Sequence, residues 1–201
     1  MCRAAGVDVV FHPDVETVYP TGATTFVEVG GLSNTLEGAF RPGHFRGVAT
    51  VVLKLFNMVL PDVAFFGQKD FQQQLVIKQM VRDLDVPVEI RTCPTLREPD
   101  GLAMSSRNVY LNPDDRQTSL VLSQALKLAT EMCRQAGTSP ASIRAAMRRH
   151  LESLPGVRID YATLVDASSL AEIESFVPEM VALIAARVGT TRLIDNERID
   201  F

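Results

Sequence analysis

The apolar positions in the first half of the chain follow two alternating patterns. In residues 45–59 they recur at helical spacing, and the length of this run favours a helix over the strand that its β-branched residues would also allow. A second helix is predicted for residues 70–84, with an apolar stripe of Leu75, Val76, Met80, Val81 and Leu84. Short continuous apolar runs are typical of buried strands, and they predict strands at 7–11, 26–29, 62–66 and 86–90.

This alternation of strands and helices predicts an α/β fold with a parallel sheet. The pattern changes near residue 95, where a loop-rich stretch begins. A long helix is expected after "NPDD", to about residue 135, and a second one after "GTSPAS", to about residue 154. The remaining pattern predicts a small mixed unit, with strands at 158–167, 179–188 and 191–195 and a short helix at 169–173. We therefore expect two domains, residues 1–94 and residues 95–201.

Composition and charge narrow the class of protein. The chain has 201 residues, 46% of them hydrophobic, and a formal net charge of -4. This balance supports a folded core and gives no overall attraction to nucleic acids or anionic membranes. Cys2, Cys93 and Cys133 form no metal-binding or paired pattern, which is typical of reduced thiols. No apolar run reaches the roughly 18 residues of a membrane span, so we expect a cytoplasmic protein.

Three basic clusters stand out against this acidic background. Arg41, His44 and Arg46 lie in "RPGHFRG", Lys69 lies in "FFGQKDFQQQ", and the third cluster is "REPDGLAMSSRN". A lysine just before a helix is disfavoured by the helix dipole unless an anion lies beside it. Ligands of open α/β sheets sit at the carboxyl ends of the strands, where helix N-termini bind phosphate. The clusters therefore indicate a phosphate-binding mouth.

Each cluster also has a plain structural interpretation. Taken alone, Lys69 and Asp70 are more typical of a solvated pair at a helix start, and "RPGHFRG" is more typical of a polar loop that caps the next helix. In the functional interpretation Asp70 balances the lysine or holds Mg²⁺ through water. Gln73 and Gln74 lie about one turn further on, so at least one of them is expected to face the same mouth.

Taken together and in order, these motifs resemble one family. The stretch from "LEGAFRPGHFRG" through "FFGQKDFQQQ", followed by "REPDGLAMSSRN" and a terminal "TRLIDN", is similar to the pantothenate synthetases, or pantoate–beta-alanine ligases. The resemblance implies the C-terminal part of a Rossmann-like nucleotidyltransferase sheet and a smaller α+β lid domain. It also implies ATP-dependent condensation of pantoate with beta-alanine through pantoyl adenylate, releasing AMP and pyrophosphate, and a homodimer in the full-length family.

The resemblance also implies site residues. The segment Gly67, Gln68, Lys69 and Asp70 matches the family's contacts to ATP and its Mg²⁺, and Leu96 is expected to contact ATP through its backbone. Gln73 matches a glutamine that holds pantoate, and Arg41 and His44 match cleft residues. The loop that closes over the phosphates is matched by Met104, Ser105, Ser106 and Arg107. We expect the catalytic set to be Lys69, Ser105, Ser106 and Arg107.

One family motif is absent from this sequence. The family's first half carries a PTMGxLHxGH segment whose two histidines grip ATP, whereas the three histidines here stand far apart. We therefore expect the chain to start after that part of the family's sequence, and to have little activity by itself because such donors stabilise the transition state. Two alternatives stay open: a non-catalytic remnant or partner fragment of the enzyme, and another nucleotidyltransferase that acts on a phosphate.

Overall fold

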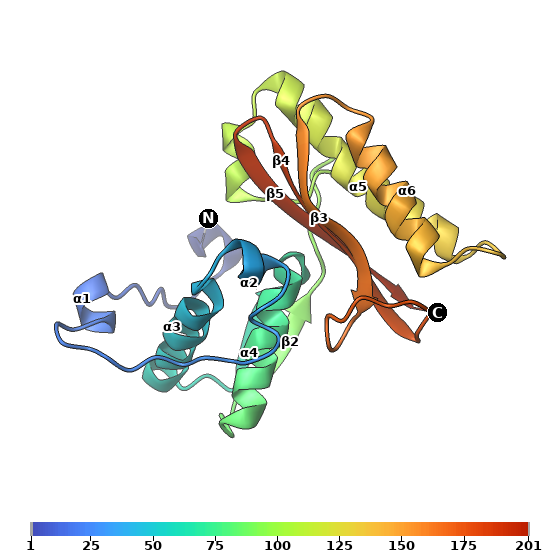
Figure 1. Cartoon of the computed structure of the whole chain (residues 1–201). Coiled ribbons are helices and arrows are strands. Elements are labelled where there is room, and N and C mark those ends of the chain that lie inside the picture. Colours follow the sequence, from blue (N-terminus) through green and yellow to red (C-terminus); the bar gives the residue numbers. More distant parts are fainter. Residues whose placement is uncertain (1, 201) are drawn as a thin grey trace.

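The computed structural model describes residues 2–200. Among them the strands form two sheets, the parallel pair β1-β2 and the antiparallel sheet β3-β4-β5. The parallel pair and helices α3 and α4 form one part of the molecule, and the antiparallel sheet with α5 and α6 forms the other (Figure 1). The elements are η1 (Cys2–Ala5), α1 (Val15–Val18), α2 (Glu37–Phe40), α3 (His44–Val59), β1 (Val63–Gly67), η2 (Gln68–Asp70), α4 (Phe71–Asp83), β2 (Glu89–Cys93), η3 (Ser106–Tyr110), α5 (Pro113–Cys133), α6 (Pro140–Glu152), β3 (Val157–Asp166), β4 (Glu179–Val188) and β5 (Thr191–Asp200).

The first part confirms the predicted α/β class. Strand β1 pairs with β2 in parallel, from Val63 opposite Glu89 to Gly67 opposite Cys93, and α4 connects the two strands. Helices α3 and α4 pack on a buried cluster that includes Phe45, Val76 and Met80. Strand β2 begins three residues later than predicted, because residues 86–88 form a tight turn in which the Val88 N–H donates to the carbonyl of Val86.

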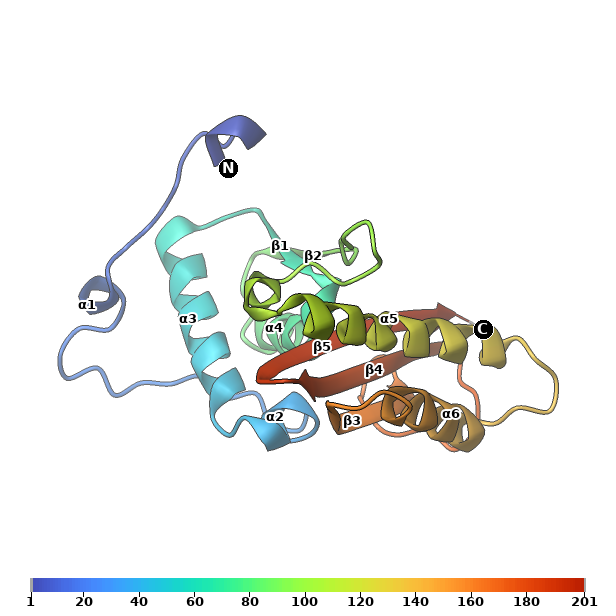
Figure 2. The ribbon, with the colours of Figure 1, turned by 90° about the horizontal axis from the view of Figure 1, so that it is seen from above.

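Two predicted strands of this part do not form. Residues 7–11 and 26–29 are extended but unpaired, and the side chains of Val9 and Val10 are exposed. A strand requires a neighbour for its backbone hydrogen bonds, and within residues 2–200 no strand lies beside either segment. Figure 2 shows this N-terminal arm running outward along the side of α3 that faces away from the antiparallel sheet.

The second part is a three-stranded antiparallel sheet with two helices on one face. Strands β3, β4 and β5 pair antiparallel, and α5 and α6 cover one face through a core that includes Leu126, Ile143 and Met147. Both helices begin at predicted signals, since Asn112 caps α5 and Ser139 caps α6. The predicted helix at 169–173 is wrong. The Asp166 carboxylate instead accepts bonds from the N–H groups of Ser168 and Ser169 and closes a turn.

The two parts meet along the other face of the antiparallel sheet. Phe71, at the start of α4, packs into a cluster with Tyr161, Leu170 and Leu183. A register shift between Ile159 and Tyr161 marks a β-bulge in this part of β3. No helix among the described residues is long and apolar enough to cross a membrane.

Candidate active site

The turn between β1 and α4 is held by the last strand of the chain. The side-chain amide of Asn196, on β5, donates to the carbonyls of Gln68 (3.0 Å) and Lys69 (2.8 Å). Asn196 is buried, and the Gln68 side chain donates back to its Oδ1 at 3.4 Å. The backbone of the predicted phosphate-binding turn is therefore fixed by a side chain from the second part of the molecule.

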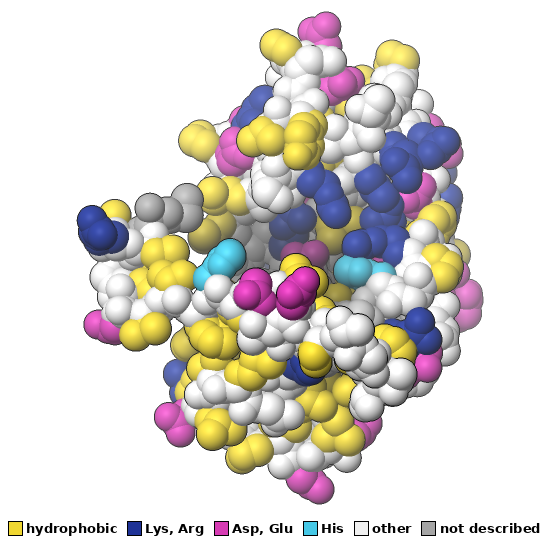
Figure 3. Space-filling view, turned by 90° about the vertical axis from the view of Figure 1, so that its left-hand side faces the viewer, with side chains coloured by type: hydrophobic (Ala, Val, Ile, Leu, Met, Phe, Trp, Pro, Cys, Tyr) yellow, Lys and Arg dark blue, Asp and Glu magenta, His cyan; other side chains and the backbone are white. Residues whose placement is uncertain are grey.

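Lys69 and Asp70 stand where two hollows of the surface join. The first hollow, here called the cleft, lies between the two parts and is lined by Glu37, Arg41, His44, Phe45, Lys69, Asp70, Phe71, Gln72, Gln73, Tyr161, Leu183, Ile194, Asp195 and Asn196. The second, here called the side groove, is lined by Gly67, Lys69, Asp70, Cys93, Pro94, Thr95, Leu96 and Met104. Figure 3 shows Lys and Arg side chains gathered at a hollow on this face. No carboxylate of the described chain pairs with Lys69.

The three glutamines of "FQQQ" have different surroundings. Gln72 is buried, accepts from the Glu37 N–H at 2.9 Å and donates to the carbonyls of Leu32 and Thr35. Gln74 is also buried and accepts from the Thr92 hydroxyl at 3.1 Å. Gln73 lines the cleft, and its amide makes no hydrogen bond to any described residue. Of the two glutamines predicted to face the mouth, Gln73 does so and Gln74 serves the packing of α4 on β2.

A buried ion pair joins the two parts across the cleft. Arg192 of β5 donates to both carboxylate oxygens of Glu37, at 2.7 and 2.8 Å, and to Asp160 at 2.7 Å. The Tyr161 hydroxyl donates to Glu37 at 2.9 Å. Burial acts to raise the pKa of Glu37, but the Arg192 bonds and the Tyr161 bond outweigh it and hold that pKa below its usual value. The β-bulge allows neighbouring residues Asp160 and Tyr161 to reach this network together.

The start of α3 contributes Arg41 and His44 to the cleft. Arg41 is 37% exposed and lies 3.8 Å from the Glu37 carboxylate. The pKa of His44 is lowered by burial and by the charge of Arg41, against the opposing charges of Glu37 and Asp70. A neutral imidazole can donate or accept one hydrogen bond without adding charge to the cleft. The predicted cluster is thus brought to the same cleft as Lys69.

The loop of residues 96–107 forms one rim of the site. The Met104 N–H donates to the carbonyl of Leu96 (2.9 Å), which closes a small hairpin and engages one backbone group of the residue that was expected to contact ATP through its backbone. Arg97 anchors this loop through two bonds to the buried Asp195, at 2.7 and 3.1 Å. Leu96 and Met104 line the side groove, so the structure brings them next to Gly67 and Lys69.

The three residues after Met104 lie away from both hollows. The Ser105 hydroxyl accepts from the Arg107 N–H at 3.2 Å and so caps η3, while Ser106 and Arg107 are exposed. Arg107 lines a third hollow beside the β4–β5 turn. The predicted loop therefore borders the side groove at Met104, but its hydroxyls do not line the cleft or the side groove.

Several cleft residues were not predicted from the sequence. They form hydrogen bonds in or beside the cleft, and Asn196 bonds directly to the turn of Gln68 and Lys69: Glu37, Gln72, Tyr161, Arg192, Asp195 and Asn196. One signal in the sequence could have indicated some of them. The segment "TRLIDN" carries polar side chains within a predicted strand, and polar groups that are buried in a strand require partners.

Comparisons with known proteins show the family of the chain. A family model described as pantoate-beta-alanine ligase matches residues 1–198. Pantothenate synthetase of Moorella thermoacetica is 52% identical over 196 residues, which cover 98% of this chain and 69% of that protein. Pantothenate synthetase 1 of Bradyrhizobium diazoefficiens is 53% identical over 197 residues, again 98% of this chain and 69% of the relative.

Solved structures give the same result. The crystal structure of pantothenate synthetase from Thermus thermophilus superposes with a TM-score of 0.94 at 47% identity, over 97% of this chain and 71% of that one. The ligase from Francisella tularensis, complexed with beta-gamma ATP and beta-alanine, has a TM-score of 0.71 at 31% identity, over 98% of this chain and 66% of that chain.

These likenesses place the chain among the AMP-forming acid–amine ligases, which use ATP. Within that class the chain belongs to the pantoate–beta-alanine ligase family, and the relatives named above carry the name pantothenate synthetase or that of the ligase.

Proposed function

We propose that the cleft activates the carboxylate of pantoate with ATP and then joins it to beta-alanine. A pantoate carboxylate oxygen attacks the α-phosphorus, the bond from that phosphorus to the bridging oxygen breaks, and pyrophosphate leaves with the electron pair. The beta-alanine amine then attacks the acyl carbon, AMP leaves and the amine loses a proton. The observation that carries this proposal is the place of Lys69, unpaired with any described carboxylate and shared by the cleft and the side groove.

Lys69 would neutralise phosphate charge as it develops. Gly67 and Gln68 precede it in the turn held by Asn196, so the backbone there is preorganised before a ligand binds. The side groove, with Leu96 and Met104, would take the nucleotide. Ser105, Ser106 and Arg107 would close over the phosphates by a movement of the rim loop, since Ser106 and Arg107 are exposed at its edge.

Pantoate would lie in the cleft beside Gln73. Its free amide can accept a hydrogen bond from a hydroxyl through its oxygen and donate one to an oxygen through its NH₂ group at the same time. Arg41 offers a guanidinium to the substrate carboxylate, because its own ion pair with Glu37 is long at 3.8 Å. His44, with its lowered pKa, would contact pantoate in the neutral form.

The residues present fit a magnesium ion that arrives with the nucleotide. Asp70 is exposed at the junction of the two hollows, and no cluster of three or more His, Cys, Asp or Glu residues in the described chain is placed to hold a metal. Mg²⁺ is commonly bound through one or two carboxylates together with substrate phosphates and waters. Asp70 would supply that carboxylate, and the ion would neutralise phosphate charge.

We further propose that residues 1–94 and 95–201 act as two domains, the second closing on the first as a lid. Strand β2 ends at Cys93, and the antiparallel sheet with its helices follows. The assembly expected for the family is a homodimer, which sedimentation of the purified chain would test.

The test of the function is pantoate-dependent formation of AMP from ATP, in the presence of beta-alanine, by the purified chain with and without Lys69→Met. We expect the substitution to lower kcat/KM by about 100-fold or more, the usual cost of losing one preorganised donor to developing charge. Lys127→Met, on α5 outside all three hollows, is the matched control and should leave the rate unchanged. Absence of pantoate-dependent AMP from the unsubstituted chain would show that this chain lacks the activity.

A further inference from the structure

The side groove has two walls, which come from different segments of the chain. Lys69 belongs to the wall formed by the turn after β1, and Leu96 and Met104 form the second wall, on the rim loop. The last pair of residues at which β1 and β2 hold these segments in register is Gly67 opposite Cys93. Beyond that pair, the position of Leu96 and Met104 relative to Lys69 depends on contacts outside the parallel sheet.

Both walls are attached to β5, at neighbouring residues. The Asn196 amide holds the turn of Lys69, as described above. The Asp195 carboxylate accepts two bonds from Arg97 of the rim loop, at 2.7 and 3.1 Å. The pairing of β4 with β5 runs through Asp195 and Asn196 in regular register, and successive side chains of a strand point to opposite faces. The two walls are therefore attached to opposite faces of one strand.

Arg97 is bonded to the rim loop itself as well as to β5. Its guanidinium donates to the carbonyl of Gly101 at 3.2 Å, and its backbone forms an isolated antiparallel bridge with Ala103. Gly101 has a φ of 94°, in the region that favours glycine, and so allows the tight tip of this hairpin. Because the Met104 N–H also bonds to the Leu96 carbonyl, a displacement of Arg97 would carry both groove residues with it.

A second attachment joins the hairpin to α5. Arg116 donates to the carboxylates of Glu98 and Asp100, at 2.6 Å each. These three side chains are 28–34% exposed, whereas the Asp195 side chain is 3% exposed. Water and salt screen the exposed pairs, while removal of one partner from a buried pair leaves an uncompensated charge. The bond of Arg97 to Asp195 is therefore the attachment whose loss should displace the hairpin most.

Arg97 itself lines neither the cleft, nor the side groove, nor the hollow beside the β4–β5 turn. We propose that it is a positioning residue for the nucleotide: its bond to Asp195 keeps the wall of Leu96 and Met104 at a fixed distance from Lys69. This inference rests on the proposed function, which assigns the side groove to the nucleotide. A ligand that contacts both walls binds more weakly when one of them must first be ordered, because ordering costs conformational entropy.

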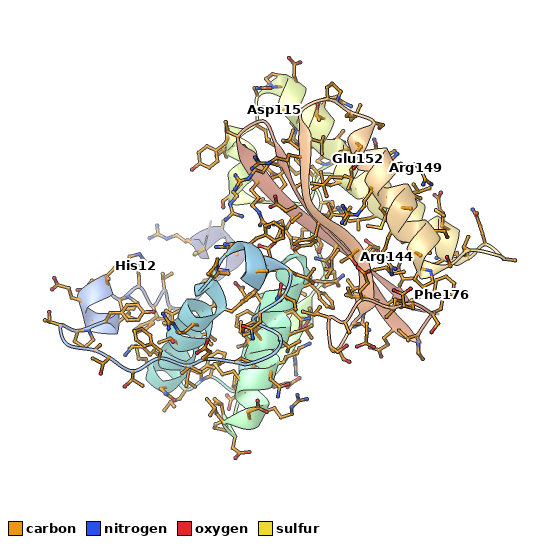
Figure 4. All side chains as sticks on the ribbon, in the orientation of Figure 1. His12, Asp115, Arg144, Arg149, Glu152 and Phe176 are labelled. Carbon is orange, nitrogen blue, oxygen red and sulfur yellow. The ribbon has the colours of Figure 1, made fainter. Side chains whose placement is uncertain are left out.

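The experiment measures binding of ATP with magnesium and, separately, of pantoate to the purified chain by calorimetry. Arg97→Gln should weaken ATP binding by about 10- to 100-fold, the range for hydrogen bonds to a charged group, and leave pantoate binding unchanged. Arg97→Lys retains the charge but loses the planar fork, so it should give a smaller loss of ATP binding. Arg149→Gln is the matched control for net charge, since Arg149 is exposed on α6 (Figure 4).

Two further measurements separate positioning from stability. Circular dichroism at the same temperature gives the folded fraction of each variant, so that each affinity refers to the folded chain. If Arg97→Gln alone does not fold, its combination with Asp195→Asn removes both buried charges and should show the same loss of ATP binding. A purely structural role of Arg97 would lower the folded fraction and weaken the binding of both ligands by the same factor.

The outcomes distinguish the positioning role from the proposed function. ATP affinity that is unchanged in the folded Arg97 variants overturns the positioning role, even where the Lys69 test succeeds. An equal loss in Arg149→Gln also overturns it, because the effect is then one of net charge. Absence of ATP binding by the unsubstituted chain overturns it together with the assignment of the side groove. A selective loss of ATP binding in a chain that forms no AMP supports the positioning role and counts against the proposed function alone.

Discussion

The two parts of the molecule bury their apolar residues to different degrees. In the second part the central strand β4 is covered on both faces, and Ile184 has no exposed surface. In the first part Val9 is 79% exposed and Phe65, on β1, is 63% exposed. An antiparallel sheet formed from consecutive hairpins supplies its own neighbours, whereas a parallel pair leaves two open edges and two faces to cover.

The difference bears on how the site is held. The predicted ligand-binding residues Arg41, His44, Lys69 and Gln73 belong to the less covered part. Two side chains of β5, in the well-covered part, bond across the junction: Asn196 holds the turn of Lys69, and Arg192 holds Glu37, which lies 3.8 Å from Arg41. The antiparallel sheet therefore supports the turn of Lys69 and the Glu37 carboxylate, while the predicted ligand-binding groups belong to the first part of the molecule.

The largest expected effect tests this support directly. Glu37→Ala should lower the free energy of unfolding by about 3–5 kcal/mol, because it leaves the Tyr161 hydroxyl without its acceptor and the buried Arg192 with Asp160 as its one remaining carboxylate partner among the described residues. Urea unfolding followed by circular dichroism measures the change. Glu174→Ala, which removes an 82% exposed partner of Arg144, should cost no more than about 0.5 kcal/mol. A cost below about 1 kcal/mol for Glu37→Ala would mean that the two parts are joined mainly by apolar contact.

A second pair of substitutions compares the buried core of the second part with the exposed N-terminal arm of the first. Ile184→Ala in β4 should lower the free energy of unfolding by about 2–5 kcal/mol, because it removes a fully buried side chain and leaves a cavity in the core. Val10→Ala, in the exposed arm, should change stability by no more than about 0.5 kcal/mol. The midpoints of urea unfolding measure both. Similar costs at the two positions would contradict the difference in burial between the two parts.

The smallest effect concerns the ionisation of His44. Its pKa should lie below the ordinary value of about 6.5, since burial and Arg41 disfavour the charged form, and Arg41→Gln should raise it. Between the lowered pKa and 6.5 the unfolded chain binds more protons, so stability from this group is complete above 6.5 and is lost as the pH falls through the folded pKa. Nuclear magnetic resonance of the imidazole as a function of pH measures this. A pKa above 6.5 would show that Glu37 and Asp70 outweigh burial.

The sequence predicted those elements whose pattern is local. Helix α3 follows its apolar spacing, α5 begins at the capping residue Asn112, and β4 covers the predicted 179–188. The same holds for the site: Arg41, His44, Lys69 and Gln73 were expected at one mouth, and all four line the cleft. A short motif can indicate a binding site because a ligand requires several polar side chains close together, and neighbouring positions in the sequence can supply them.

The wrong predictions depend on specific bonding partners, which the composition of a segment does not indicate. Residues 7–11 have the composition of a buried strand, but pairing with a neighbour decides whether a strand forms. Residues 169–173 have helical composition, but the side chain of Asp166 closes a turn there. The bond from Asn196 to the turn of Lys69 spans 127 positions of sequence, and no local pattern indicates which carbonyl a buried amide will meet.

The spacing of Arg192 and Asn196 along β5 sets which groups of the candidate site the strand can reach. Arg192 and Asn196 are four residues apart on a strand, so they share the face that meets the first part, and a slip of one residue would turn both away from it. A single insertion or deletion between them would therefore separate Glu37 or Lys69 from its support while leaving every ligand-binding residue in the sequence. The spacing within the last ten residues of the chain sets the position of a lysine that lies in its first half.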